Sequence, residues 1–440
     1  MYTCGPTVYD FAHIGNFRTF LFEDLLRRYL KYKGYKVVQV MNLTDVDDRT
    51  IAASRKEGIP LSEFTARYKK AFFEDLKSLN AEPAEHYPDA TAHINEMVEI
   101  IQKLMKEGYA YESSRSIYYK ISAFPGYGTL PHFKPDELKA GARIAADSYE
   151  KEEVGDFALW KGWDAEDGEV FWETPLGKGR PGWHIECSAM SMKYLGSKFD
   201  IHTGGVDNIF PHHENERAQS DAYVGHPVVN FWLHSEHLIV EGKKMSKSLG
   251  NFYTPRDLLA KGFSPMPIRY LLLSAHYRMP LNFTFEGLAG AKNALERLYD
   301  FQRNVRDAEE GRDHVEVTHA IHKARENFEQ NMDDDLNVSG ALGILFDFVR
   351  NINRLAAAQG LSPNDKIKIG EFLCKTDSVL GFLKEHAALI DAEVERLIAQ
   401  RNDARRQRDF ARSDELRAEL EQMGIILEDT PQGTKWKKRL

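Results

Sequence analysis

Residues 4–43, CGPTVYDFAHIGNFRTFLFEDLLRRYLKYKGYKVVQVMNL, are the stretch from which we predict the fold. Apolar side chains recur at helical spacing within 17–33, and Gly34 follows as a helix terminator. The β-branched run at 36–43 is typical of a buried strand. A strand, a turn, a helix and a strand in this order form a βαβ unit. We therefore expect a parallel sheet with its ligand site beyond the carboxyl ends of the strands.

The rest of the chain divides by composition into four further regions. Residues 63–108 have a helical pattern, and 110–180 are rich in tyrosine, glycine and proline, which predicts a mixed insertion with strands. Residues 181–255 return to the α/β style, and the sequence is strongly helical from about 256. The expected fold class is α/β: a Rossmann-like parallel-sheet domain, split by a mixed α/β insertion and followed by a C-terminal α-helical bundle.

The composition is that of an ordinary globular protein. Of 440 residues, 42% are hydrophobic and 28% are charged, and the net charge of −9 gives no overall attraction to nucleic acid. No apolar run reaches the roughly 18 residues that span a bilayer, and no signal peptide precedes Cys4. Three cysteines argue against a disulfide framework, so we expect a cytoplasmic protein without a membrane partner. Cys374 lies in a helical stretch, where we expect it to pack in the interior.

Four residues that are far apart in the sequence are candidate metal ligands: Cys4, Cys187, His212 and Glu216. Two thiolates, an imidazole and a carboxylate are ligands that zinc accepts. His212 and Glu216 are four residues apart and would share a helix face, but His213 competes with His212 because it is three residues from Glu216. Spacing alone does not decide the question, since a buried cysteine and a surface His–Glu pair are more common.

Two short motifs are candidates for binding a nucleotide. HIGN (13–16) lies where the first strand turns into the first helix; helix-start amides, His13 and the Asn16 amide are suited to phosphate oxygens, and Gly15 permits close approach. KMSKS (244–248) places Lys244 and Lys247 on a loop between two glycines. Such lysines could close over a triphosphate and offset the charge that develops on departing pyrophosphate.

The two motifs together resemble the signatures of class I aminoacyl-tRNA synthetases, and five longer segments resemble those of the cysteinyl-tRNA synthetase family. These segments are NLTDVDD (42–48), DFALWK (156–161), RPGWHIECSAM (180–190), FPHHENE (210–216) and DFARSD (409–414). The resemblance covers essentially the whole chain. Asn16 replaces the second histidine of the first motif; it keeps a hydrogen-bond donor but cannot carry a positive charge. Family members also have a short segment before the position of Cys4, so we expect either a preceding segment or another element at that edge.

The resemblance implies an ATP-dependent ligation of L-cysteine to its cognate tRNA through a cysteinyl-adenylate, with Mg²⁺ accompanying ATP. It implies one Zn²⁺ per chain, held by the four candidate ligands, with the substrate thiolate in the open position. Zinc binds a soft thiolate far better than a hydroxyl, which would separate cysteine from serine. The implied catalytic residues are His13, Asn16, Lys244 and Lys247. The implied substrate-binding residues are Gly5, Thr7, His13, Gly15, Asn16, Thr44, Trp183, Gly204, Gly205, Asp207 and Lys247; for Trp183, plain core packing is the alternative.

The resemblance also assigns domains along the chain. They are a catalytic domain at 1–109 and 181–255, a connective insertion at 110–180, a stem-contact region at 256–310, a helical bundle at 311–390 and an anticodon-binding region at 391–440. In the last, the arginine-rich segment 397–408 and Trp436 are candidates for tRNA contact. We expect a monomer. Two alternatives share many of these features: a cysteine–amino-sugar ligase of the same ancestry, as in mycothiol synthesis, and a non-catalytic tRNA-binding paralogue.

Overall fold

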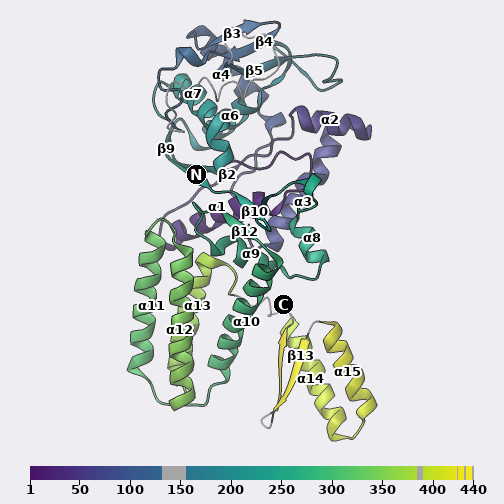
Figure 1. Ribbon diagram of the computed structural model, residues 1–440, viewed down its shortest axis with the longest axis vertical. Helices are drawn as coiled ribbons and strands as arrows, with labels where there is room; N and C mark the ends of the chain where they lie inside the picture. Colours follow the sequence, from purple (N-terminus) through teal and green to yellow (C-terminus); the bar gives the residue numbers. More distant parts are fainter. Residues whose placement is uncertain (131–154, 384–389, 424, 431–432, 439–440) are drawn as a thin grey trace. The chain divides into compact units, whose positions relative to one another are not determined.

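The computed structural model describes residues 1–130, 155–383, 390–423, 425–430 and 433–438 (Figure 1). Part of the insertion expected at 110–180 therefore lies outside the described residues. The chain forms two compact units. The first contains Met1–Asp257 and Leu272–Thr284, and the second contains Leu258–Leu271 and Phe285–Leu440. Residues 256–310, expected as one stem-contact region, are thus divided between the two units.

A four-stranded parallel sheet organises the first unit. Its strand order is β2-β1-β8-β9, and all three pairings are parallel. The strands are β1 (Tyr2–Thr3), β2 (Val40–Met41), β8 (Phe199–Gly205) and β9 (Val229–Ser235). Helix α1 (Ile14–Tyr32) connects β1 to β2, which confirms the predicted βαβ unit and parallel sheet.

Two local details of this unit differ from the prediction. Helix α1 begins at Ile14 rather than at 17, because His13 and Asn16 form a reciprocal capping box that satisfies the first free amides. The strand predicted over 36–43 is restricted to Val40–Met41, because its partner β1 is itself only two residues long. Beyond it the chain is held by single backbone bridges, such as Thr7 with Thr44.

Two smaller sheets and several helices complete the first unit. The five-stranded sheet has the order β3-β4-β5-β7-β6 and is antiparallel throughout. Its strands are β3 (Ala110–Ser113), β4 (Ser116–Tyr119), β5 (Phe157–Gly162), β6 (Trp172–Thr174) and β7 (Gly177–Pro181), which accords with the strands predicted for 110–180. The three-stranded sheet comprises β10 (Leu238–Val240), β11 (Lys243–Lys244) and β12 (Leu281–Phe283). The helices are α2 (Asp48–Glu57), α3 (Leu61–Ser78), α4 (Ile94–Lys106), α6 (Trp183–Leu195) and α7 (Glu214–Val224), and α8 (Pro255–Ala260) follows at the unit's boundary.

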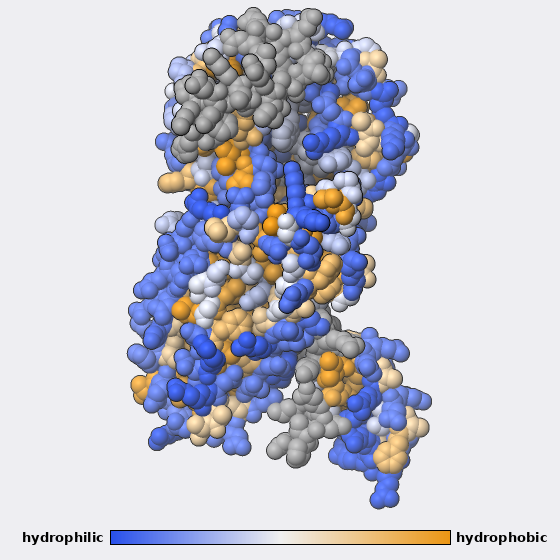
Figure 2. Space-filling model, viewed as in Figure 1, coloured by the Kyte–Doolittle hydropathy of each residue, from blue (hydrophilic) through white to orange (hydrophobic). Residues whose placement is uncertain are grey.

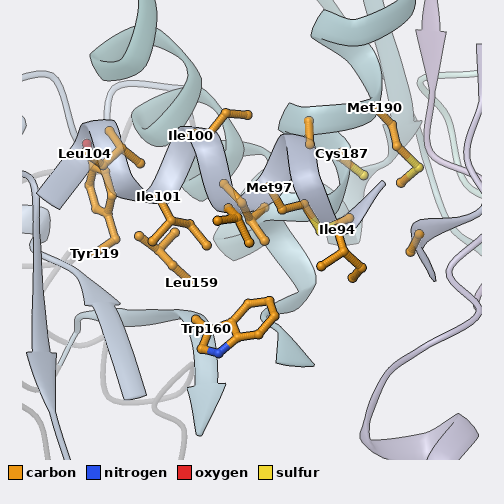
Figure 3. Packing of buried hydrophobic residues seen from close by; sticks show 14 of the residues in the cluster. Ile94, Met97, Ile100, Ile101, Leu104, Tyr119, Leu159, Trp160, Cys187 and Met190 are labelled. Atoms are coloured by element: carbon orange, nitrogen blue, oxygen red, sulfur yellow. The ribbon is translucent and has the colours of Figure 1, made fainter. Parts of the chain in front are cut away.

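The core of the first unit lies around α4. This helix buries Ile94, Met97, Ile101 and Leu104, which recur at helical spacing on one face. Figure 3 shows these side chains together with those of Leu159 and Trp160 from β5 and of Cys187 and Met190 from α6. Cys187 therefore belongs both to a rigid core and to the wall of the cavity described below, which fixes the position of its sulfur.

The second unit is mainly helical, as predicted. Its longer helices are α9 (Pro265–Ser274, which extends into the first unit), α10 (Phe285–Asp307), α11 (Val315–Asp333), α12 (Val338–Gln359) and α13 (Pro363–Leu380). Helices α11, α12 and α13 run side by side (Figure 1). The buried Arg269 donates a hydrogen bond to the carbonyl oxygen of Leu380 at the end of α13, at 2.9 Å. Cys374 is exposed on α13, so the prediction that it packs in the interior was wrong: residues 372 and 373, not 374, lie on the inward face.

The C-terminal part has its own small core. Helices α14 (Ile390–Arg406) and α15 (Phe410–Gln422) form the predicted hairpin. An antiparallel pair of strands follows, β13 (Ile425–Thr430) and β14 (Gly433–Lys438), which we had not predicted. Buried residues from both helices and β13 form the core, namely Val394, Leu397, Ile398, Leu416, Leu420 and Ile425. Trp436 packs partly against this core, so its ring contributes to the stability of the region.

The visible face of the molecule is mostly hydrophilic, and its apolar residues lie among polar ones (Figure 2). None of the described helices is both long enough and apolar enough to cross a bilayer.

A buried carboxyl on α1 predicts a pH dependence of stability. Burial raises the pKa of Glu23 to about 8 from its ordinary value of 4.5, although Thr203 Oγ1 donates to its Oε1 at 2.8 Å. Between these two pKa values the folded chain keeps the proton and the unfolded chain releases it. The free energy of unfolding should therefore fall as the pH rises from about 5 to 8, by up to about 1.4 kcal/mol per pH unit. In urea titrations at several pH values, Glu23→Gln should flatten this slope; an unchanged slope would contradict the assignment.

Candidate active site

A cavity of about 770 Å³ lies at the carboxyl ends of the four parallel strands. Residues that follow each strand line it: Cys4 to Asn16 after β1, Asn42 and Thr44 after β2, Asp207 and Asn208 after β8, and Glu236 to Leu238 after β9. The cavity therefore lies where a ligand site is expected in a parallel sheet. The loop after β11 and the first turn of α6 complete its wall, through Lys244, Lys247 and Trp183.

His13 and Asn16 are held by each other at the start of α1. Asn16 N donates to His13 Nδ1, and His13 N donates to Asn16 Oδ1, each at 3.1 Å. Burial lowers the pKa of His13, which favours the neutral imidazole. Because Nδ1 already accepts a hydrogen bond, a neutral His13 carries its proton on Nε2. This Nε2–H and the Asn16 side-chain amide remain as donors for a ligand in the cavity.

The glycines predicted to bind the nucleotide differ in their surroundings. Gly15 and Gly205 line the cavity. A Cβ on Gly5 would lie 1.8 Å from the carbonyl oxygen of Asn42, so a side chain is excluded there by the neighbouring backbone. Gly204 is not among the residues lining the cavity, and a Cβ on it would lie 2.8 Å from the His213 ring. Packing therefore accounts for glycine at positions 5 and 204.

The loop lysines lie on the same cavity as His13. Lys244 and Lys247 are both exposed and both line it. Lys247 Nζ forms an ion pair with Asp10, which belongs to the turn between β1 and α1, and this contact raises the pKa of Lys247. A triphosphate entering the cavity would compete with Asp10 for this ammonium group.

Folding brings the four candidate metal ligands together, although they are far apart in the sequence. The donor atoms of Cys4, Cys187, His212 and Glu216 all lie within 4.8 Å of one another, and all four residues are buried. Cys187 Sγ is 3.5 Å from His212 Nε2, and His212 Nε2 is 3.8 Å from Glu216 Oε2. Three elements supply them: the segment after β1, the first turns of α6, and the irregular turn (209–213) that leads into α7.

The chemistry of this cluster fits a bound divalent cation. Glu216 Oε2 is buried and has no hydrogen-bond partner in the described residues, which is costly for a carboxylate unless a cation neutralises it. The contact with Cys187 and burial raise the pKa of Cys4, burial raises that of Cys187, and burial lowers that of His212. All three groups are thus neutral in the absence of a metal. Binding of a soft cation would release the thiol protons and give the thiolate form.

Additional histidines surround the cluster, and they were not predicted from the sequence. His212 Nδ1 is 2.9 Å from His184 Nδ1, and His202 Nε2 is 2.8 Å from Glu216 Oε1. His213 Nδ1 is 2.8 Å from His234 Nε2, while its Nε2 lies 3.2 Å from Cys4 Sγ. Cys4, His202, His213 and Glu216 consequently form a second group with metal-ligand spacing. Cys4, Cys187 and His212 line the cavity, however, whereas His202 and His213 are not among its lining residues, and this difference favours the first group.

Three other predicted residues lie on the cavity wall. Trp183 is 42% exposed, so core packing does not explain it, and its ring stacks on that of His212 with centroids 4.2 Å apart. Thr44 and Asp207 also line the cavity. Thr7 lines it as well, beside Thr44, with which it forms a parallel bridge.

Comparisons with known proteins agree with this arrangement. The family model described as "tRNA synthetases class I (C) catalytic domain" matches residues 1–293, a DALR domain matches 327–384, and a "Cysteinyl-tRNA ligase anticodon binding domain" matches 388–436. The cysteine–tRNA ligase of Protochlamydia amoebophila is 51% identical over 445 residues, which cover 100% of this chain and 93% of that protein. This chain belongs to the cysteine–tRNA ligase family. The family members from Brachyspira hyodysenteriae and Chlamydia muridarum are 48% and 50% identical, and this chain covers 94% and 95% of their lengths.

Solved structures of other synthetases share the fold of this cysteine–tRNA ligase family member. Mycobacterium tuberculosis methionyl-tRNA synthetase, solved with methionyl-adenylate, has a TM-score of 0.61 at 16% identity, with 87% of this chain and 89% of that chain covered. An Agrobacterium radiobacter leucyl-tRNA synthetase complex has a TM-score of 0.63 at 11% identity, with 87% and 84% covered. These likenesses establish the class I fold alone.

The arginine-rich segment of this family member divides into two kinds of residue. Arg401 is buried, and its Nη1 donates to Thr434 Oγ1 on β14 at 3.3 Å, so it holds the strand pair to α14. Arg405, Arg406 and Arg408 are exposed. Of the four arginines, these three are accessible to a large polyanion.

Proposed function

We propose that this protein activates L-cysteine with ATP and transfers it to the cognate tRNA, with a zinc ion selecting the substrate thiolate. One observation carries the proposal: a single cavity is lined by both nucleotide motifs and by three of the four candidate metal ligands. A cysteinyl-adenylate needs both groups of residues, because its phosphate and its thiol belong to one small molecule.

The first step is an in-line displacement. A carboxylate oxygen of cysteine attacks the α-phosphorus of ATP, and the bond to the pyrophosphate oxygen breaks. His13 Nε2–H and the Asn16 amide donate to phosphate oxygens, and Lys244 and Lys247 offset the charge that develops on pyrophosphate. Asp207 accepts from the ribose hydroxyls, and Mg²⁺ accompanies the triphosphate. Positioning and charge stabilisation account for the rate, because the protein forms no covalent bond with the substrate.

The second step transfers the cysteinyl group. A hydroxyl of the terminal adenosine of tRNA attacks the carbonyl carbon of the adenylate, and AMP leaves. The match of 388–436 to an anticodon-binding domain supports tRNA rather than an amino sugar as the acceptor. Both loop lysines and all four candidate ligands are present, which supports an enzyme rather than a non-catalytic paralogue.

Cys4, Cys187, His212 and Glu216 would hold the zinc ion. When bound, zinc supplies an open position that prefers a soft thiolate to a hydroxyl, a distinction that packing makes poorly between cysteine and serine. The chain itself contributes the fixed donor positions and the exclusion of water by Trp183, whose ring covers His212.

Cysteine-dependent ATP–pyrophosphate exchange tests this proposal. Exchange should occur with cysteine and not with serine, disappear when the metal is removed, and return when zinc is added. Absence of exchange with cysteine would contradict the proposed activity. Exchange that survives removal of the metal would contradict the zinc part alone.

Replacing the exposed arginines of α14 should weaken tRNA binding without affecting the cavity. In the double variant Arg405→Ala/Arg408→Ala, we expect the KM for tRNA to rise several-fold, roughly one decade at most, and the salt dependence of binding to weaken by about one unit of slope per phosphate contact. Pyrophosphate exchange should be unchanged, because it does not require tRNA. An equal loss in both assays would contradict a tRNA-specific role.

A further inference from the structure

Glu186 is a buried carboxyl that none of the steps above uses. It lies on α6, beside Cys187, and its exposed fraction is 0%. Thr44 Oγ1 donates a hydrogen bond to Glu186 Oε2 at 2.8 Å. The other oxygen, Oε1, has no hydrogen-bond partner among the described residues. A carboxyl group in such a position costs stability, so it needs an explanation other than packing.

Thr44 is fixed from three sides at the wall of the cavity. Its backbone N donates to the carbonyl oxygen of Pro6 at 3.2 Å, and its carbonyl oxygen accepts from Val8 N at 3.1 Å. Its hydroxyl oxygen accepts from Asn42 Nδ2 at 3.3 Å. Since these contacts join Thr44 to the segment that follows Cys4, the hydroxyl lies at a fixed place on the same cavity as the metal-ligand cluster.

The hydrogen bonds of Thr44 determine what its hydroxyl can still do. A hydroxyl group has one proton and two lone pairs. The proton is donated to Glu186, and one lone pair receives the Asn42 amide, so the remaining capacity is that of an acceptor. An ammonium group offers three donors and no acceptor. The hydroxyl therefore suits the α-ammonium group of an amino acid whose sulfur is near Cys4 and Cys187.

We propose that Glu186 is a positioning residue: by taking the Thr44 proton, it presents the Thr44 oxygen as an acceptor to the α-ammonium group of cysteine. The inference rests on the proposed function and deepens it, because it assigns recognition of the amino group to a pair of residues separate from the metal ligands. Glu186 acts through Thr44 and does not itself touch the substrate.

Equilibrium binding of two thiols to the zinc-loaded protein tests the inference. L-Cysteine and 3-mercaptopropionate share the thiol and the carboxylate, and only cysteine has the ammonium group. The metal contributes equally to both, so the ratio of their dissociation constants isolates the ammonium contact. A hydrogen bond to a charged group is worth a factor of about ten or more, so Glu186→Met should lower the preference for cysteine by about that factor.

Three variants separate positioning from a general structural effect. Thr44→Val should lower the preference as Glu186→Met does, and the double variant should lower it no further, because the two residues act in series. Glu186→Gln keeps an acceptor oxygen and should retain the preference. Glu23→Met is the matched control: it also removes a buried carboxyl that accepts from a threonine hydroxyl at 2.8 Å and has an unpartnered oxygen, but it should leave the ratio unchanged.

An unchanged ratio in Glu186→Met, or independent multiplying effects in the double variant, would overturn the inference. An equal change in Glu23→Met would also overturn it. If Glu186→Met does not fold, Thr44→Val and Glu186→Gln decide the question without removing the acceptor from α6. Failure of the proposed function is distinguishable, because wild-type protein would then bind neither thiol.

Discussion

Replacing Cys187 with serine is expected to abolish stoichiometric zinc binding and to lower kcat/KM for cysteine activation by at least about 100-fold. Residues that only support a metal ligand already contribute roughly 10–100-fold to affinity or activity, and a ligand itself should contribute more. The serine hydroxyl remains protonated and is a poor donor to zinc, whereas its volume is close to that of the thiol. Zinc content by elemental analysis and pyrophosphate exchange with cysteine measure the two effects.

The exposed Cys374 on α13 provides the matched control for this variant. Cys374→Ser should keep both the zinc content and the exchange rate, because its sulfur is not among the donor atoms of the cluster. Retention of one zinc per chain in Cys187→Ser would show that Cys4, His202, His213 and Glu216 hold the metal instead.

Replacing Lys247 with alanine should lower kcat for exchange by about 100-fold or more, the range found when one preorganised donor to a developing charge is removed. The KM for ATP should change much less. In the free protein Lys247 is paired with Asp10, so it has to leave this partner to reach a phosphate, and its net contribution is realised mainly in the transition state. Steady-state exchange kinetics at varied ATP concentration separate the two constants.

Lys243→Ala is the control for Lys247→Ala. Lys243 lies on the same short strand as Lys244 and is exposed, but it is not among the residues that line the cavity. It should keep kcat within about twofold of wild type, as expected of a surface substitution away from the site. A variant of Lys247 with normal kcat and a raised KM would show that this lysine binds ATP only in the ground state.

Periodicity in the sequence was sufficient to predict the architecture around the cavity. The helical spacing of 17–33 and the β-branched run after Gly34 predicted the βαβ unit, and the position of the site followed from the rule for parallel strands. The cap formed by His13 and Asn16 was not predicted, because histidine is not a typical capping residue. The strand pair at 425–438 was missed because each strand is short, although alternation in Lys-Trp-Lys after the turn residues Pro431 and Gly433 was a usable signal.

The metal-ligand cluster could not be derived from spacing. Cys4 and Cys187 are separated by most of the first unit, and no local pattern joins them, so only the family resemblance pointed to the set. The surrounding His184, His202 and His234 were not predicted for the same reason: each occupies an ordinary position on a helix or strand, and only the packing of α6, β8 and β9 brings them to the cluster. Glu186 likewise looks like any helical glutamate until its burial is known.

X-ray absorption at the zinc edge tests the central claim most directly, because it counts the sulfur atoms bound to the metal. We predict two sulfur ligands in the substrate-free protein, from Cys4 and Cys187, and three when L-cysteine is added, with no change when serine is added. A sulfur count that stays the same on addition of cysteine would contradict the selection of the substrate by its thiolate.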